Sequence, residues 1–195
     1  IRSREIRAVC FDVENRPLAY WYDDRTSAEI TAIGWKWSDE ADVNTLLLLR
    51  TGRFLRDDGS TLSPETAYIT FRDVLHRADL VYGHNIRTHD LPLVQAALFR
   101  LQLPLLEPLW TSDTYRDLPK RKDMSVSLEN LAALYGLPGE KLRMAQVEWE
   151  QANRLTRDGI DNARARVTSD VLLQEALRTR LAELGLLGDR RRWKS

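Results

Sequence analysis

The segment Ala8–Asn15 reads AVCFDVEN and has the composition of a buried β-strand that also carries two acids. Because side chains alternate along a strand, its large apolar residues fall on one face, whereas Asp12 and Glu14 share the other. Two carboxylates that point the same way in a partly buried place repel each other and resist desolvation. A divalent cation is the simplest partner that stabilises both, so this strand predicts a metal site.

The bulk properties are those of a globular protein. A chain of 195 residues is long enough for one domain with a substantial core. Lys plus Arg (29) equals Asp plus Glu (29), but nucleic-acid binding depends on how charge is distributed rather than on its sum. The single cysteine excludes an internal disulfide and a cysteine-rich zinc site. No apolar run approaches the roughly 18 residues of a membrane span, and no signal peptide is visible. We therefore expect a protein of the reducing cytoplasm with no membrane partner.

Alternating and helical patterns follow one another along the chain. Segments of strand character occur over 6–13, 29–37, 44–50, 80–83 and 109–113. Segments of helical spacing occur over 63–78, 91–101, 127–135, 147–154 and 160–184. The first three strands are joined by short turns, which predicts an antiparallel meander followed by strands that alternate with helices. We expect one α/β domain over residues 1–187, with a five-stranded mixed sheet and helices on both faces, and a basic C-terminal tail over 188–195.

Two further acids, Asp90 and Asp170, have both a structural and a functional interpretation. Asp90 directly follows the fourth predicted strand, where an acid in the first turn of a helix is common. Asp170 lies at the edge of the apolar stripe of the last helix, three residues after Val167 and next to Val171. An acid there is costly unless it has a partner. The equal alternative is a boundary residue that turns to solvent or pairs with an arginine such as Arg164, Arg166 or Arg178.

The four acids indicate more together than singly. An Asp-x-Glu strand, an acid after a later strand and an acid on a final helix can converge at one end of a sheet. Four carboxylates that hold two hard cations are the arrangement that phosphodiester hydrolysis by a two-metal mechanism requires. Oxygen-only ligands suit Mg²⁺ or Mn²⁺ rather than Zn²⁺.

Three short motifs occur in order: FDVE at Phe11–Glu14, GHNIRTHDLP at Gly83–Pro92 and VTSDVL at Val167–Leu172. With them the chain resembles the DEDD superfamily of 3′–5′ exonucleases, the ribonuclease H-like domains found in proofreading polymerases. The second motif is the most specific. Residues 112–114 and 127–132 match the family loosely, so the resemblance spans about residues 6 to 184, nearly the whole chain.

The resemblance implies a ribonuclease H-like fold and assigns roles to six residues. The catalytic residues and ligands of two divalent ions, Mg²⁺ or Mn²⁺, would be Asp12, Glu14, Asp90 and Asp170. His84 and Asn85 would shape the loop beside the nucleotide-binding groove. Val13 and Tyr115 are further candidates for contact with the substrate, Tyr115 along the backbone of a single strand, with a solvated loop as its equal alternative. Loop packing is an equal alternative for His84, and Asn85 is the preferred contact of the two.

Aromatic and basic segments offer further contacts to nucleic acid. The aromatic run Tyr20–Tyr22 can stack on unpaired bases, although hairpin packing is the stronger alternative. Arg116 and the basic run Lys120–Lys122 can line a phosphate backbone, with a solvated charged loop as the equal alternative. The basic residues of Arg190–Lys194 can add nonspecific affinity.

One departure from the family concerns the third motif. The family usually has a Tyr four residues before the final Asp or a His five residues before it, and this side chain orients or deprotonates the attacking water. Arg166 and Ala165 stand at these positions. Arginine stays protonated and cannot act as a general base. Either another group such as His89 replaces the base, or the metal ions suffice, or the activity is weak.

The sequence thus predicts an enzyme, a metal-dependent 3′–5′ exonuclease that hydrolyses single-stranded nucleic acid to nucleoside monophosphates. Its partner would be the 3′ end of single-stranded DNA or RNA, with DNA favoured by analogy with proofreading domains, and a polymerase or replication protein could recruit it. The alternative is a catalytically weak or inactive nucleic-acid-binding module on a degenerate exonuclease fold. An endonuclease on the same fold is a third possibility.

Overall fold

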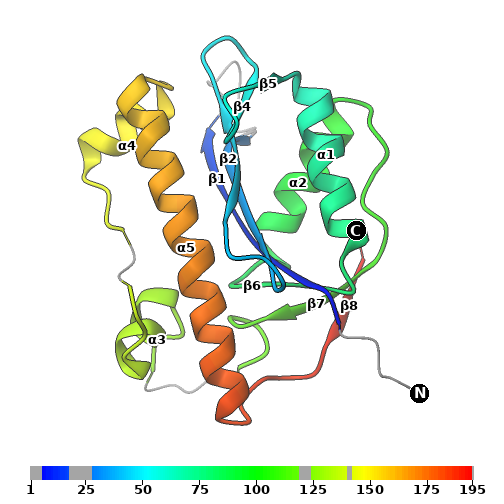
Figure 1. Ribbon diagram of the computed structural model, residues 1–195, viewed down its shortest axis with the longest axis vertical. Helices are drawn as coiled ribbons and strands as arrows, with labels where there is room; N and C mark the ends of the chain where they lie inside the picture. Colours follow the sequence, from blue (N-terminus) through cyan, green and yellow to red (C-terminus); the bar gives the residue numbers. More distant parts are fainter. Residues whose placement is uncertain (1–5, 18–27, 119–123, 140–141, 195) are drawn as a thin grey trace, which may run out of the picture.

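A mixed sheet separates two helical layers in the computed structural model, which describes residues 6–17, 28–118, 124–139 and 142–194 (Figure 1). The strands in these residues are β1 (Ala8–Pro17), β2 (Ala28–Trp37), β3 (Asn44–Leu48), β4 (Phe54–Arg56), β5 (Thr61–Leu62), β6 (Leu80–Gly83), β7 (Leu109–Asp113) and β8 (Arg191–Trp193). They lie in the order β5-β4-β3-β2-β1-β6-β7-β8. The strands from β5 to β1 pair antiparallel, and β6 and β7 continue parallel to β1. The predicted meander followed by parallel strands is confirmed.

The predicted number of five strands is wrong, because the sheet has eight in the described residues. Strands β4 and β5 are three and two residues long, too short to show an alternating pattern. Strand β8 reads RRW and pairs antiparallel with β7, with Trp193 opposite Leu109. Trp193 is buried in the main core. Residues 191–193 therefore belong to the sheet and not to a separate basic tail, because one buried tryptophan outweighs the charge of its neighbours.

The helices cover both faces of the sheet, as predicted. They are α1 (Pro64–Arg77), α2 (Asp90–Arg100), α3 (Leu128–Tyr135), α4 (Gln146–Asn153) and α5 (Arg157–Glu183). Three of them begin where a side-chain hydroxyl accepts a backbone N–H, at Ser63, Ser127 and Thr156. Figure 1 shows α1 and α2 on one side of the sheet, and the long α5 with α3 and α4 on the other. No helix in the described residues combines the length and apolar character that crossing a membrane requires.

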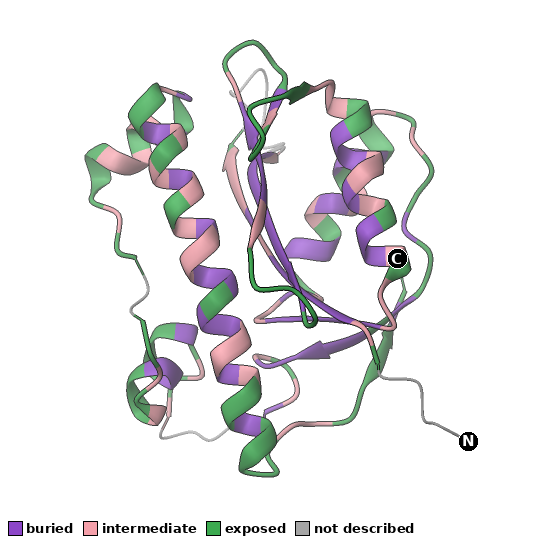
Figure 2. Cartoon of the chain, in the orientation of Figure 1, coloured by how far each residue is buried: buried purple, intermediate pink, exposed green. Residues whose placement is uncertain are grey.

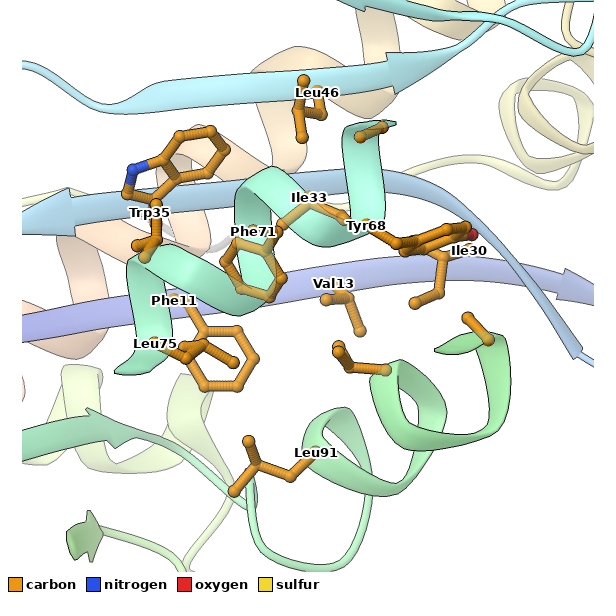
Figure 3. Close-up of a cluster of buried hydrophobic side chains, with 14 of the residues drawn as sticks. Phe11, Val13, Ile30, Ile33, Trp35, Leu46, Tyr68, Phe71, Leu75 and Leu91 are labelled. Carbon is orange, nitrogen blue, oxygen red and sulfur yellow. The ribbon is translucent and has the colours of Figure 1, made fainter. Parts of the chain in front are cut away.

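The two faces of β1 have different neighbours. Val9, Phe11 and Val13 belong to the main core with α1 and α2 (Figure 3), and the Phe11 ring lies 5.4 Å from that of Phe71. Cys10, on the opposite face, packs against Val171 of α5. Buried residues accordingly fill the central strands and recur along α5 (Figure 2). This arrangement confirms the predicted alternation and turns the acid-bearing face of β1 toward α5.

Two glycines allow the elements around the acids to approach closely. Gly34 of β2 pairs with Asp12, and a Cβ there would lie 3.0 Å from a Val167 methyl group of α5. Gly83 ends β6, and a Cβ there would lie 2.5 Å from the Ile86 side chain and 2.7 Å from the Gln174 amide oxygen. The absence of these Cβ atoms brings α5, β1 and the segment after β6 into direct contact.

Gly83→Ala should therefore destabilise the protein. The added methyl group would overpack a closed site between Ile86 and Gln174, which typically costs about 1–3 kcal/mol. Unfolding in urea, monitored by circular dichroism, measures this loss. The control Ala133→Ser, at an exposed position of α3, should change the unfolding free energy by less than about 0.5 kcal/mol. An unchanged midpoint for Gly83→Ala would contradict the close packing.

Candidate metal centre

Three carboxylates from two elements meet on the side of β1 that faces α5. Asp12 and Glu14 come from β1 and Asp170 from α5, and each offers an oxygen within 4.8 Å of the others. Asp170 is 3% exposed, so its carboxylate lies on the buried side of the helix and not in solvent. A group of hard oxygen donors at this spacing can hold a metal ion.

The fourth predicted acid adjoins this group from another direction. Asp90 is the first residue of α2, is 2% exposed, and accepts the backbone N–H of Val13 through Oδ1 at 3.1 Å. Strand β6 pairs with β1 only along Ala8–Cys10. Helix α2 begins beside the next part of β1, at Val13. The carboxylate of Asp90 is close enough to raise the pKa of Asp12. The four acids therefore gather along the middle of β1, just past the part that pairs with β6.

Strand β1 and helix α5 face each other in antiparallel fashion. Glu14 contacts Arg166 near the start of α5, and Asp12 accepts the side-chain N–H of Gln174 two turns later at 2.8 Å. Arg166, Asp170 and Gln174 are spaced four residues apart and so share one helix face. The register of β1 against β2 shifts between Glu14 and Asn15, a bulge beside the acids, and the ladder then continues to Pro17.

The acids raise one another's pKa. Burial raises the pKa of Asp12 well above its usual range, and the charges of Asp90, Asp170 and Glu14 raise it further, against the hydrogen bond from Gln174. Burial also raises the pKa of Asp90 to about 7, although the Val13 N–H opposes this shift. Ionisation of the whole cluster at neutral pH is therefore unfavourable without a cation.

Arg166 supplies a positive charge inside the cluster. Its Nε donates to Glu14 Oε1 at 2.6 Å, and a terminal nitrogen lies 3.7 Å from Asp170 Oδ2. This contact agrees with the alternative that Asp170 pairs with an arginine. Sequence reasoning dismissed Arg166 as a base and did not place it at Glu14. It also missed Gln174, although the four-residue spacing from Asp170 was a visible signal.

Gln174 connects the acids to the second motif through its side-chain amide. The Gln174 amide donates to Asp12 and accepts the backbone N–H of His84 at 3.1 Å. The His84 Nδ1 lies 2.9 Å from the Thr114 hydroxyl, and its ring packs edge-on against Tyr115 at 5.4 Å. The rings of His84 and Tyr115 thus lie together, the His84 backbone shares Gln174 with Asp12, and loop packing explains part of the His84 position.

Asp113 holds the loop that contains Asn85. Its buried carboxylate accepts the backbone N–H groups of Asn85 at 2.8 Å, Arg87 at 3.0 Å and Tyr115 at 3.0 Å. Asn85 has a φ of 69°, which asparagine tolerates better than most residues, and its side chain accepts the Thr88 hydroxyl at 2.7 Å. Asp113 is therefore a structural cap, and Asn85 has a local role in the turn. Contacts of Val13, His84, Asn85 and Tyr115 with substrate stay predictions.

The remaining candidates fall outside the cluster. Tyr20–Tyr22 and Lys120–Lys122 lie outside the described residues. Arg116 is exposed and donates to the Thr88 hydroxyl at 2.8 Å. His89 precedes α2, and partial burial lowers its pKa, the direction opposite to that expected of an imidazole among carboxylates. His89 therefore receives no support as a replacement base.

Asp90→Asn should stabilise the metal-free protein at alkaline pH. The folded pKa of Asp90, about 7, lies above the ordinary value of 3.8, so the folded state retains this proton while the unfolded state releases it. The unfolding free energy should fall as pH rises from about 4 to 7 and then level off. Asparagine keeps an oxygen for the Val13 N–H but cannot ionise. At pH 8 in EDTA the unfolding free energy of the variant should exceed that of wild type by about 1–3 kcal/mol.

Denaturant titrations at pH 4, 6 and 8 measure this difference. Asp161→Asn, an exposed acid on the same helix as Asp170, is the matched control and should track wild type at each pH. A pH 8 stability of Asp90→Asn at or below that of wild type would show that Asp90 carries no electrostatic penalty.

Comparison with known proteins shows a shared fold. No protein-family model and no curated protein matches the sequence. Among solved structures, the family B DNA polymerase from the hyperthermophilic archaeon Pyrobaculum calidifontis superposes with a TM-score of 0.61 at 16% sequence identity. The match covers 91% of this chain and 25% of the polymerase, so the chain spans about a quarter of that protein. The chain therefore shares the fold of one part of that DNA polymerase.

Proposed function

We propose that this protein is a metal-dependent 3′–5′ exonuclease that hydrolyses single-stranded nucleic acid to nucleoside monophosphates. The observation that carries the proposal is the convergence of Asp12, Glu14 and Asp170 within 4.8 Å. Asp90 adjoins them through its hydrogen bond to Val13, which lies between Asp12 and Glu14 on β1. A cluster of buried like charges is unfavourable for folding and calls for a compensating function. The fold match to a DNA polymerase supports the same conclusion as the resemblance of the three motifs to proofreading exonucleases.

The donor set fits Mg²⁺ or Mn²⁺, because every candidate ligand is a carboxylate oxygen. In the proposed enzyme Asp12, Glu14, Asp90 and Asp170 are the ligands available to divalent metal, which would supply Lewis-acid activation of water and phosphate. The protein's own contribution is orientation. Gln174 fixes one Asp12 oxygen, and the Val13 N–H fixes one Asp90 oxygen. Such hydrogen bonds hold ligating carboxylates in place before the ions and substrate arrive.

The proposed substrate groove lies beside the second motif. The rings of His84 and Tyr115 lie next to each other, and the Gln174 amide connects the His84 backbone to Asp12. In the proposal Val13, His84, Asn85 and Tyr115 contact the terminal nucleotides, since aromatic faces stack on bases of any sequence. DNA is favoured over RNA because the motifs resemble proofreading domains and the matching structure is a DNA polymerase. A polymerase or replication protein is the proposed macromolecular partner on the same grounds.

A second candidate function is a nucleic-acid-binding module on an inactive exonuclease fold. One observation favours it: Arg166 replaces the usual Tyr and contacts Glu14 and Asp170, two of the proposed ligands. The retention of all four acids favours the enzyme, because a pure binder gains nothing from negative charges that face a polyanion.

Digestion of single strands labelled at the 5′ end distinguishes these functions. Wild type with Mg²⁺ or Mn²⁺ should shorten DNA, and RNA more slowly, in a ladder from the 3′ end, and EDTA should stop the reaction. Asp12→Ala should lower the rate by about 10²–10⁴-fold, the scale expected for loss of one catalytic group. Asp161→Ala, an exposed acid on α5, should retain wild-type activity.

The other outcomes are equally informative. Intact substrates that wild type still binds would favour the binding module over the enzyme. Internal cleavage would favour an endonuclease. Cleavage that persists in EDTA or in Asp12→Ala would contradict the assigned site.

A further inference from the structure

The guanidinium of Arg166 lies within the carboxylate cluster and not on its rim. Only 12% of the Arg166 side chain is exposed, compared with 14% for Glu14 and 5% for Asp170. Its contacts to these two residues, at 2.6 Å and 3.7 Å, are therefore shielded from water. Shielding strengthens the attraction between charges well beyond that of a surface ion pair.

Three separate parts of the chain hold this side chain in place. Besides its carboxylate partners, Arg166 donates to the backbone carbonyl of Leu142 at 2.6 Å, and its guanidinium lies 4.8 Å from the ring of Trp149 on α4. A planar guanidinium uses such fixed hydrogen bonds and ring contacts better than a lysine would. The segment from Leu142 to α4 therefore fixes the cation over Glu14.

The position of this cation conflicts with full occupancy by metal. Glu14 and Asp170 are two of the three carboxylates that lie within 4.8 Å of one another. A divalent ion that binds both must displace the guanidinium or share its partners. Because arginine stays protonated over the accessible pH range, the competition is permanent. Asp12 is different, because its hydrogen-bond partner is the neutral amide of Gln174.

We propose that Arg166 is a built-in cation that competes with one divalent ion for Glu14 and Asp170. Wild type then binds one ion per chain, with Asp12 as its principal ligand, where the four carboxylates alone would bind two. The inference rests on the proposed function, since it concerns the metal centre of the same site. It also accounts for an arginine at the position where the resembling nucleases have their general base. The arginine substitutes for the positive charge of one metal ion and does not take over the transfer of a proton.

Titration with Mn²⁺ alone tests this inference without any assay of activity. Isothermal calorimetry should give one Mn²⁺ per chain for wild type and two for Arg166→Gln, which keeps the length of the side chain but loses its charge. Electron paramagnetic resonance should show an isolated ion in wild type. In Arg166→Gln it should show a spin-coupled pair, as expected for ions about 3.5–4 Å apart.

Two variants serve as controls. Arg166→Lys retains a positive charge and should still bind one ion. Arg178→Gln removes another α5 arginine that lies over an aromatic ring, 4.6 Å from that of Tyr82, and should bind Mn²⁺ as wild type does. Melting curves in EDTA establish that each variant folds, and Arg166→Gln should gain a larger rise in Tm from Mn²⁺ than wild type.

Each outcome decides the inference. Two ions in wild type, or equal stoichiometry and affinity in wild type and Arg166→Gln, would overturn it. Zero ions in wild type but one in Arg166→Gln would overturn the inference that wild type keeps one ion at Asp12, together with the proposed metal-dependent activity. No binding by either would overturn both proposals. If Arg166→Gln does not fold, the wild-type resonance spectrum decides: a coupled pair overturns the inference and an isolated ion supports it.

Discussion

The crowding of four carboxylates around the middle of β1 is the constraint on which the rest of this structure depends. Burial and mutual repulsion raise the pKa of Asp12 and Asp90, so the cluster is costly wherever no cation balances it. The surrounding architecture holds the charges there nevertheless. Gly34 lets α5 pack closely on the sheet beside Asp12, and α2 begins where the Asp90 carboxylate meets the Val13 N–H. A fold that maintains such a cost without stability in return has a use for the site.

Much of this arrangement could be predicted from local patterns. The alternation in AVCFDVEN identifies which face of β1 carries the acids, and helical spacing places Asp170 on the buried side of α5. The ion pair of Arg166 with Glu14 could not be predicted, because it depends on the register of α5 against β1, which tertiary packing sets. Strands β4 and β5 are too short to show a period, and the pairing of β8 depends on one tryptophan in a basic segment. Short-range patterns thus identify the acids, whereas their partners follow from packing between distant elements.

Arg166 links the two candidate functions. A guanidinium carries one charge and a divalent ion carries two, so the arginine relieves only part of the repulsion in the cluster. A fold shared with part of a DNA polymerase is compatible with catalysis and with binding alone, because function resides in the site and not in the fold. Arg166 is held by specific contacts with Glu14 and Trp149. These contacts indicate that the arginine has a defined position at the acids and does not merely fill the place of another residue.

Anomalous scattering from crystals grown with Mn²⁺ and a short single-stranded DNA tests whether the acid cluster is a nuclease metal site. An anomalous peak is expected within bonding distance of the Asp12 carboxylate, with the 3′ end of the DNA directed toward it beside His84 and Tyr115. Carboxylates that keep their positions with no Mn²⁺ among them, or DNA bound elsewhere on the surface, would contradict the proposed site.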